Sequence, residues 1–151
     1  MKENKGNFLM FSAIDFGSAD YEESIILRDI VLRKPLGMQY LAEDLAAEFD
    51  SFHLVLKDKE EVVACLVMKP IDHKIIKMRQ VAVHPSRQGQ NIGRQLVEFS
   101  EVFSKSKGFE IIELNARKTA VPFYLKLNYT IIGDEFLEVN IPHFKMIKNL
   151  V

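Results

Sequence analysis

The chain has 151 residues, 48% of them hydrophobic, and a formal net charge of −1. This length and composition predict a single folded domain over residues 1–151 with a sizeable core, and they exclude an intrinsically disordered protein. Together with a pI near 6.4, the small net charge argues against nucleic acid as a general partner.

The N-terminal part of the chain predicts a strand followed by two helices. Residues 7–14 are typical of a short strand. Residues 20–34 predict a helix that Pro35 and Gly37 end, and a second helix is expected over residues 41–49. The apolar residues at helical spacing are Ile26, Leu27, Ile30 and Val31 in the first helix, and Leu41, Leu45 and Phe49 in the second.

The middle of the chain predicts strands. Residues 52–57 and 61–69 are separated by the charged turn "DKEE", which indicates an antiparallel hairpin, and residues 75–83 predict the next strand. Cys65 lies in the apolar run "EVVACLVM". We therefore expect a buried structural thiol there, and no disulfide, cysteine metal site or catalytic nucleophile.

The second half predicts a long helix over residues 91–107 that ends at Gly108. Its apolar face carries Ile92, Leu96, Phe99 and Phe103. The elements that follow are a strand over residues 109–115, a short helix over 120–127, and two strands over 129–139 and 143–150. The order β-α-α-β-β-β-α-β-α-β-β predicts an α/β (α+β) fold, in which a mixed sheet carries helices on both faces.

The segment "HPSRQGQNIGRQL", His84 to Leu96, sets two glycines and an asparagine between a strand and a helix. Gly89 and Gly93 allow an anion to approach the N–H groups of the helix N-terminus, and Asn91 tolerates a left-handed conformation. An ordinary strand-to-helix turn explains this stretch equally well. It is not a nucleotide P-loop, because no Lys-Ser or Lys-Thr pair follows the last glycine. It is not a dinucleotide fingerprint, because the glycine spacing differs.

Two motifs in this half resemble the GNAT superfamily of acyl-CoA-dependent N-acetyltransferases. The loop "QGQNIG", residues 88–93, matches the family pattern Gln/Arg-x-x-Gly-x-Gly/Ala, with Asn91 in place of the first glycine. The segment "LNARKTAVPFYLKLNY", residues 114–129, resembles the family's strand and helix with their Ala-x-x-x-Tyr spacing, and has Asn128 where glycine is usual. In the first half, "LRDIVLRKPLG", residues 27–37, resembles a bacterial subgroup whose acceptors are mostly undefined.

The resemblance implies a GNAT-like, mostly antiparallel sheet and acetyl-CoA (coenzyme A) as cosubstrate, with no metal. The pantetheine arm would lie beside the strand that ends at Val83, where a bulge would open the sheet and the N–H of Val81 or Val83 would polarise the thioester carbonyl. The pyrophosphate would rest on the loop. The implied cofactor-binding residues are Val81, Ala82, Val83, Gln88, Gly89, Gln90, Asn91, Ile92, Gly93, Arg94, Asn115, Ala120 and Tyr124.

Within this resemblance, we expect Tyr124 to act as general acid, because a phenol can protonate a departing thiolate. Packing against the sheet is the alternative. The base is less defined, since the strand segment "MRQV", residues 78–81, has no carboxylate where many family members carry one. The candidates are Glu48, His53, His84 and His143. We place His143 and Glu48 with Tyr124 in the catalytic set, and interpret His84 as a turn residue and His53 as a strand residue. A water relay, or an amine that arrives deprotonated, is also compatible.

The implied reaction is transfer of an acetyl group to a primary amine of a small molecule or to a protein amino group. An acyl-CoA-binding regulatory or sensing module is the alternative, favoured by the missing strand carboxylate and disfavoured by Tyr124. A mixed α/β domain of unrelated function is a third interpretation, and a homodimer stays open. No apolar stretch is long enough to cross a membrane, and "MKENKGNF" lacks a signal-peptide core. We therefore expect a cytoplasmic protein with no membrane partner.

Overall fold

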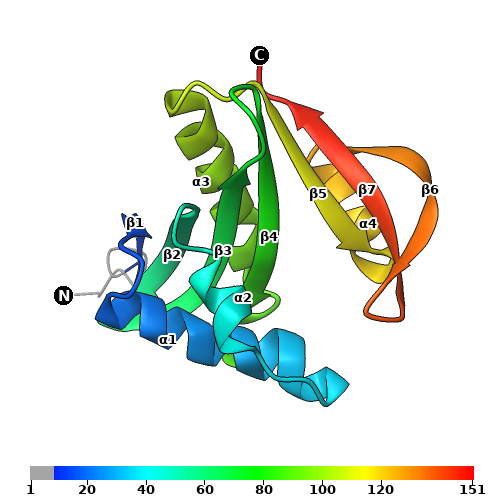
Figure 1. Cartoon of the computed structure of the whole chain (residues 1–151). Helices are drawn as coiled ribbons and strands as arrows, with labels where there is room; N and C mark the ends of the chain where they lie inside the picture. The colour runs from blue at the N-terminus through cyan, green and yellow to red at the C-terminus, as the bar shows by residue number, and fades with distance from the viewer. Residues whose placement is uncertain (1–8) are drawn as a thin grey trace.

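The computed structural model describes residues 9–151, which build one seven-stranded sheet (Figure 1). The strands are β1 (Leu9–Ile14), β2 (Phe52–Asp58), β3 (Glu61–Pro70), β4 (Ile75–Val83), β5 (Ile111–Arg117), β6 (Thr130–Glu138) and β7 (Ile141–Asn149). Their order in the sheet is β1-β2-β3-β4-β5-β7-β6, and every neighbouring pair is antiparallel except β4–β5. This confirms the mixed, mostly antiparallel sheet. The first two residues of the strand expected over 7–14 lie outside the described residues.

Helices cover both faces of the sheet, as expected. The helical segments are α1 (Ala19–Arg28), the π-helical turn η2 (Asp29–Arg33), the 3₁₀ turn η3 (Lys34–Leu36), α2 (Ala42–Ala46), the 3₁₀ turn η4 (Pro85–Arg87), α3 (Ile92–Ser106), the 3₁₀ turn η5 (Lys118–Ala120) and α4 (Val121–Lys126). One face of the sheet is covered by α1 and the other by α3, while α4 packs against β5 (Figure 1). The order of strands and main helices is the expected one.

The first helical stretch begins and ends with clear signals. The hydroxyl of Ser18 accepts the N–H of Tyr21 at 3.2 Å and caps α1. The chain then passes through η2 and η3 without leaving helical conformation and ends at Gly37, which has a left-handed φ of 68°. The helix expected over residues 20–34 is thus present, with a wider turn near its end.

The buried face of this helix differs from the expected one. Leu27 is buried, but Ile26 is 63% exposed and Ile30 also lies at the surface. Arg28 is buried instead, with 1% of its surface exposed. Hydropathy alone misassigns this face because the side chain of Arg28 is paired with a buried carboxylate.

The second predicted helix is wrong in extent. Only Ala42–Ala46 is helical, and the chain continues in turns as far as Asp50. Leu41 and Phe49, expected on the buried face, are exposed, whereas Glu48 between them is buried. A short helix without a side-chain cap depends on tertiary contacts, and the contacts of Glu48 fix this segment.

A bulge in β4 reverses the direction of its side chains. Met78 before the bulge and Val83 after it both pack into the core beneath α3. In a regular strand, an even-numbered and an odd-numbered residue would point to opposite faces. The pairing of β4 with β3 shifts so that Gln80 and Val81 both lie opposite Leu66. One extra residue in a strand exchanges its two faces. Before the bulge, Lys77 and Arg79 alternate with Met78 and therefore point to the α1 face of the sheet.

Candidate functional site

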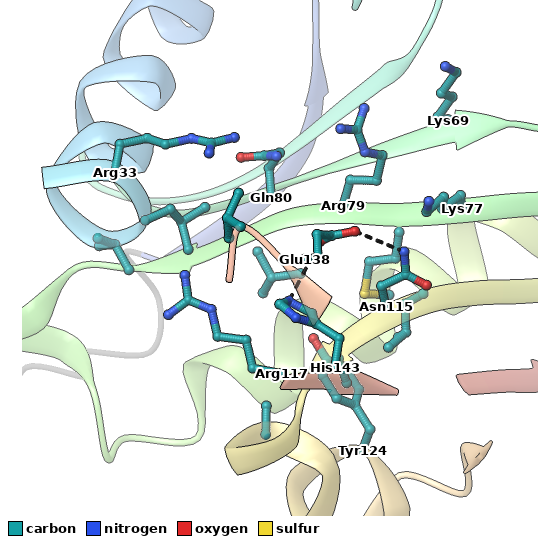
Figure 2. Close-up of a pocket in the computed structure, with 18 of the residues that line it drawn as sticks. Arg33, Lys69, Lys77, Arg79, Gln80, Asn115, Arg117, Tyr124, Glu138 and His143 are labelled. Atoms are coloured by element: carbon teal, nitrogen blue, oxygen red, sulfur yellow. Dashed lines mark hydrogen bonds and ion pairs between the residues drawn. The ribbon is translucent and has the colours of Figure 1, made fainter. Parts of the chain in front are cut away.

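A cleft opens where β4 and β5 part. Their parallel pairing runs from Ile75–Ile111 to Met78–Leu114, and in residues 9–151 it does not continue beyond, although both strands do. The cleft has a volume of about 750 Å³, which is in the range of small-molecule sites. Its polar lining includes Gln80, Asn115, Tyr124, Glu138 and His143, which come from β4, β5, α4, β6 and β7 (Figure 2).

The bulge in β4 lies on the wall of this cleft. Gln80 has a left-handed φ of 56°, and its side-chain oxygen accepts the hydroxyl of Tyr40 at 2.6 Å. That contact ties the bulge to the segment after η3. The N–H of His84 donates to the carbonyl of Val63 on β3 at 2.8 Å. Because successive N–H groups of a strand alternate in direction, those of Val83 and Val81 point away from β3 and toward the cleft.

The loop before α3 has the conformation expected of an anion cradle. Gly89 and Asn91 have left-handed φ angles of 80° and 63°. Asn91 therefore supplies the conformation for which the family motif uses glycine. The first N–H groups of α3, those of Ile92, Gly93 and Arg94, have no partner within the helix, and in the described chain no side chain caps them. The loop residues Gln88, Gly89, Gln90 and Asn91 are all exposed.

One arginine of the loop is already engaged. The guanidinium of Arg87 pairs with the carboxylate of Asp58 at the end of β2, so its charge anchors the loop to the sheet. The side chain of Gln88 donates to the carbonyl of Val83 at 3.1 Å and closes the loop onto β4. The anion ligands that the loop can still offer are its backbone N–H groups and the exposed Arg94 at the start of α3.

Tyr124 lies on α4 and lines the cleft across from the bulge (Figure 2). It is 8% exposed, and its ring packs edge-on against Phe123 and Tyr129. Burial raises the pKa of Tyr124 to about 12. The phenol therefore keeps its proton at every working pH, and it is a weaker acid than its ordinary pKa near 10 suggests.

His143 on β7 has a fixed tautomer. Its Nδ1 lies 2.6 Å from the carbonyl oxygen of Ile141. Because a carbonyl only accepts, Nδ1 carries the hydrogen, and Nε2 of the neutral ring holds the lone pair. This Nε2 lies 3.6 Å from Glu138, whose other oxygen accepts the amide N–H of Asn115 at 3.2 Å (Figure 2). The three side chains form one connected polar group in the cleft.

Glu48 is held in a separate buried cluster. Its two oxygens accept from the guanidinium of Arg28 at 2.8 and 2.6 Å, and the hydroxyl of Tyr21 donates to it at 3.2 Å. Burial raises the pKa of the Glu48 carboxyl, but the hydrogen bonds and charge of Arg28 outweigh it, and the pKa is lowered overall. Arg28 also donates to the hydroxyl of Tyr40 at 3.4 Å, so the cluster connects to the bulge at Gln80.

The remaining candidates have structural contacts. His53 is buried, its Nε2 lies 3.0 Å from the carbonyl of Glu48, and burial lowers its pKa. His84 accepts the N–H of Ser86 and belongs to the turn, as expected. Cys65 is buried, and burial raises the pKa of its thiol to about 12. Among residues 9–151, no group of three or more His, Cys, Asp or Glu side chains is arranged to hold a metal ion.

Sequence reasoning missed three polar residues of this region. Glu138 bridges Asn115 and His143, and Tyr40 with Gln80 anchors the bulge. Nothing local in the sequence marks them, because each contact joins segments that only the sheet brings together. Ala120, which the resemblance placed at the cofactor, lines the cleft.

Comparisons with known proteins agree with this geometry. A model of the acetyltransferase (GNAT) family matches residues 20–129. A relative from Bacillus subtilis (strain 168), the uncharacterized N-acetyltransferase YjcF, is 28% identical over 129 residues, which cover 85% of this chain and 91% of the relative.

Two solved structures share the fold. A candidate N-acetyltransferase from Lactobacillus plantarum has a TM-score of 0.85 at 23% identity and covers 95% of this chain and 99% of its own. An aminoglycoside 6'-N-acetyltransferase in complex with coenzyme A has a TM-score of 0.80 at 18% identity, covering 94% and 97%. In the described part of this chain, no helix is both long and apolar enough to span a membrane.

Proposed function

The chain belongs to the GNAT acetyltransferase family and is an acyl-CoA-dependent N-acetyltransferase; from this premise we propose that it transfers an acetyl group from acetyl-CoA to a primary amine. The observation that carries the proposal is the bulged β4, where the N–H groups of Val81 and Val83 point away from β3, to the side on which β4 and β5 part, and where α3 begins after the end of the strand. An extended pantetheine arm can pair with such an edge as an added strand does.

The residues of the cofactor half fit the two ends of acetyl-CoA. The loop from Gln88 to Arg94 would hold the pyrophosphate through backbone N–H groups at a helix N-terminus. Space around Gly89 supports this role, since a Cβ built there would meet no heavy atom of the described residues within 4 Å. Along the β4 edge, the N–H of Val81 or Val83 would donate to the thioester carbonyl. Asn115 lines the same cleft from β5.

Tyr124 would donate its phenolic hydrogen to the departing sulfur. A thiol has an ordinary pKa of about 8.5, whereas the pKa of Tyr124 is about 12. Full proton transfer from the tyrosine to a free thiolate is therefore uphill by about 3.5 pKa units. Tyr124 contributes chiefly as a hydrogen-bond donor while negative charge grows on the sulfur. Overall, the amine loses one proton and the departing thiolate gains one, so the reaction is balanced in protons.

His143 is the side chain that we assign to the amine. Its neutral ring offers Nε2 as an acceptor, and the carboxylate of Glu138 beside it attracts an ammonium group. Glu48, the other residue expected at the acceptor, has both oxygens engaged by Arg28 and does not line the cleft. We therefore propose His143 as general base, acting directly or through a water, and a positioning role for Glu48.

Thiol release from acetyl-CoA, followed with a thiol-reactive dye over a panel of amines, tests this function. We expect release that depends on one class of amine and saturates with it. If acetyl-CoA binds but no amine accelerates thiol release, the chain is a sensing or regulatory module and the transferase proposal is wrong.

A further inference from the structure

The cleft carries positive charges that the transfer reaction does not use. We call the following residues the cleft cations: Arg33, Lys69, Lys77, Arg79 and Arg117. They come from η2, β3, β4 and β5 and surround the cleft (Figure 2). Within residues 9–151 none of them forms an ion pair, and Glu138 is the single carboxylate of the cleft lining. In a chain with a net charge of −1, this is a strong local excess.

Two of these cations are placed where they repel each other. Lys69 and Lys77 are direct partners in the antiparallel β3–β4 ladder, an arrangement that destabilises a sheet when the charges are alike. Arg79 follows two residues after Lys77 and points to the same face. The carboxylate of Glu113 lies beside Lys77 across β4–β5, but it pairs with Lys145 at 3.3 Å. A bound anion would relieve this repulsion.

Binding of the cofactor pyrophosphate does not explain the cleft cations of β4. Lys77 lies about 20 Å along the strand from Val83, after which the loop begins. Its side chain also points to the α1 face, whereas α3, which carries the loop at its N-terminus, covers the other face. We therefore assign the charges of Lys77 and Arg79 to the acceptor side of the cleft.

We infer that the acceptor amine also carries an acidic group, a carboxylate or a phosphate, which the cleft cations bind. The inference rests on the proposed function, because it names the acceptor class for the same site. An acceptor with separate ends matches the cleft: Glu138 and His143 face its amine, and Lys77 with Arg79 hold its acid. A polycationic acceptor such as an aminoglycoside would meet repulsion instead, so the acceptor of the structurally similar aminoglycoside acetyltransferase is a poor model for this chain.

Matched pairs of amines test the inference. Phosphoethanolamine and ethanolamine differ by the phosphate, and β-alanine and β-alaninamide differ by the carboxylate charge. Cadaverine and kanamycin provide polycations. We expect kcat/KM for the charged member of at least one pair to exceed that of its neutral partner about tenfold or more at low salt, and the preference to shrink in 0.5 M salt (about 4 Å Debye length). The phosphate and carboxylate pairs show which acid is recognised.

Variants connect the preference to the cleft. Lys77→Gln and Arg79→Gln should each lower the preference for the acidic amine severalfold while the neutral amine is used as before. Lys105→Gln is the matched control, because Lys105 is exposed on α3 at the opposite face. The folded state of each variant is checked by its thermal melting curve.

A binding assay separates this inference from the transfer activity. Ligand-observed NMR titrations of the four paired amines and of cadaverine and kanamycin, with and without coenzyme A, need no turnover. Tighter binding of an acidic amine with no transfer to any amine would support the inference and contradict the proposed function. Transfer or binding that is equal for both members of each pair, or strongest for a polycation, would overturn the inference and leave the transferase proposal standing.

Discussion

Replacing Glu48 with glutamine should lower the free energy of unfolding. It removes no group from the cleft, because Glu48 does not line the cleft. Arg28 and Glu48 are almost fully buried, with 1% and 7% of their side-chain surfaces exposed, and share two short hydrogen bonds of 2.8 and 2.6 Å. Breaking one partner of a buried pair costs about 3–5 kcal/mol, because the other charge stays buried without compensation. Glutamine retains one acceptor oxygen, so we expect the lower end, about 3 kcal/mol, or a fall in Tm of roughly 6–12 °C.

Urea denaturation at pH 7 measures this loss, and the exposed Glu43→Gln on α2 is the control, with an expected change below about 0.5 kcal/mol. The pKa of Glu48 is lowered in the folded state, so the pair stabilises the fold above the unfolded pKa near 4.5 and loses that contribution as the pH falls through the folded pKa. The difference between parent and Glu48→Gln should therefore narrow in acid.

A double variant separates the effect of an unpaired buried charge on stability from the effect of a changed side-chain shape. Arg28→Met with Glu48→Leu removes both charges and should recover at least half of the loss seen in Glu48→Gln. The reasoning would be refuted if Glu48→Gln were as stable as the parent while its KM for the acceptor rose. That result would assign the carboxylate to acceptor binding, as the sequence alone suggested.

Four further outcomes are expected. Gly93→Val should weaken acetyl-CoA binding in calorimetry about tenfold or more, because a Cβ at Gly93 makes ordinary contacts of 3.7 Å with Phe123 and Val83, and the two further methyl groups would press on these side chains and displace the start of α3. Unchanged affinity would remove the loop from the site, and Gly93→Ala, whose Cβ fits, is the control. Tyr124→Phe should lower kcat about a hundredfold with little change in cofactor affinity, and full activity of the variant would assign the ring to packing. Because the pKa of Tyr124 is about 12, the parent should lose no activity through ionisation of this tyrosine below pH 11. His143→Ala should lower acceptor-dependent turnover about a hundredfold while acetyl-CoA binds normally; a parent-like rate would remove His143 from the site. Val139→Asn should raise stability by about 1 kcal/mol, because this valine has a left-handed φ of 46° in the β6–β7 turn; an unchanged or lower Tm would show that the turn is not strained.

The cofactor half of the site could be predicted because its signals are local. Gly89 and Asn91 mark left-handed positions directly, and the conformation of Asn91 follows from the same steric rule that makes glycine common there. Asn128, at the other place where the family uses glycine, is likewise left-handed with a φ of 71°. Strand and helix limits in this half were correct to within about two residues, since period and stop signals agree.

The part of the site that would bind the acceptor amine could not be predicted, because its contacts join residues far apart in the sequence. A periodicity analysis places apolar residues inside, and it fails at Arg28 and Glu48, which are buried only because they pair with each other. The repulsion between Lys69 and Lys77 exists only in the register of β3 with β4, which no single-sequence pattern specifies. The role of Glu138 depends in the same way on the folding of β6 against β7.

Product analysis tests the central claim most directly. The protein is incubated with acetyl-CoA labelled with ¹³C in the acetyl group and with the amine that best accelerates thiol release, and thiol and amide are quantified in the same sample. We expect one N-acetyl amide for each thiol released, with both falling together in Tyr124→Phe and His143→Ala. Thiol release without amide, or labelled acetate in its place, would contradict N-acetyl transfer as the function of this cleft.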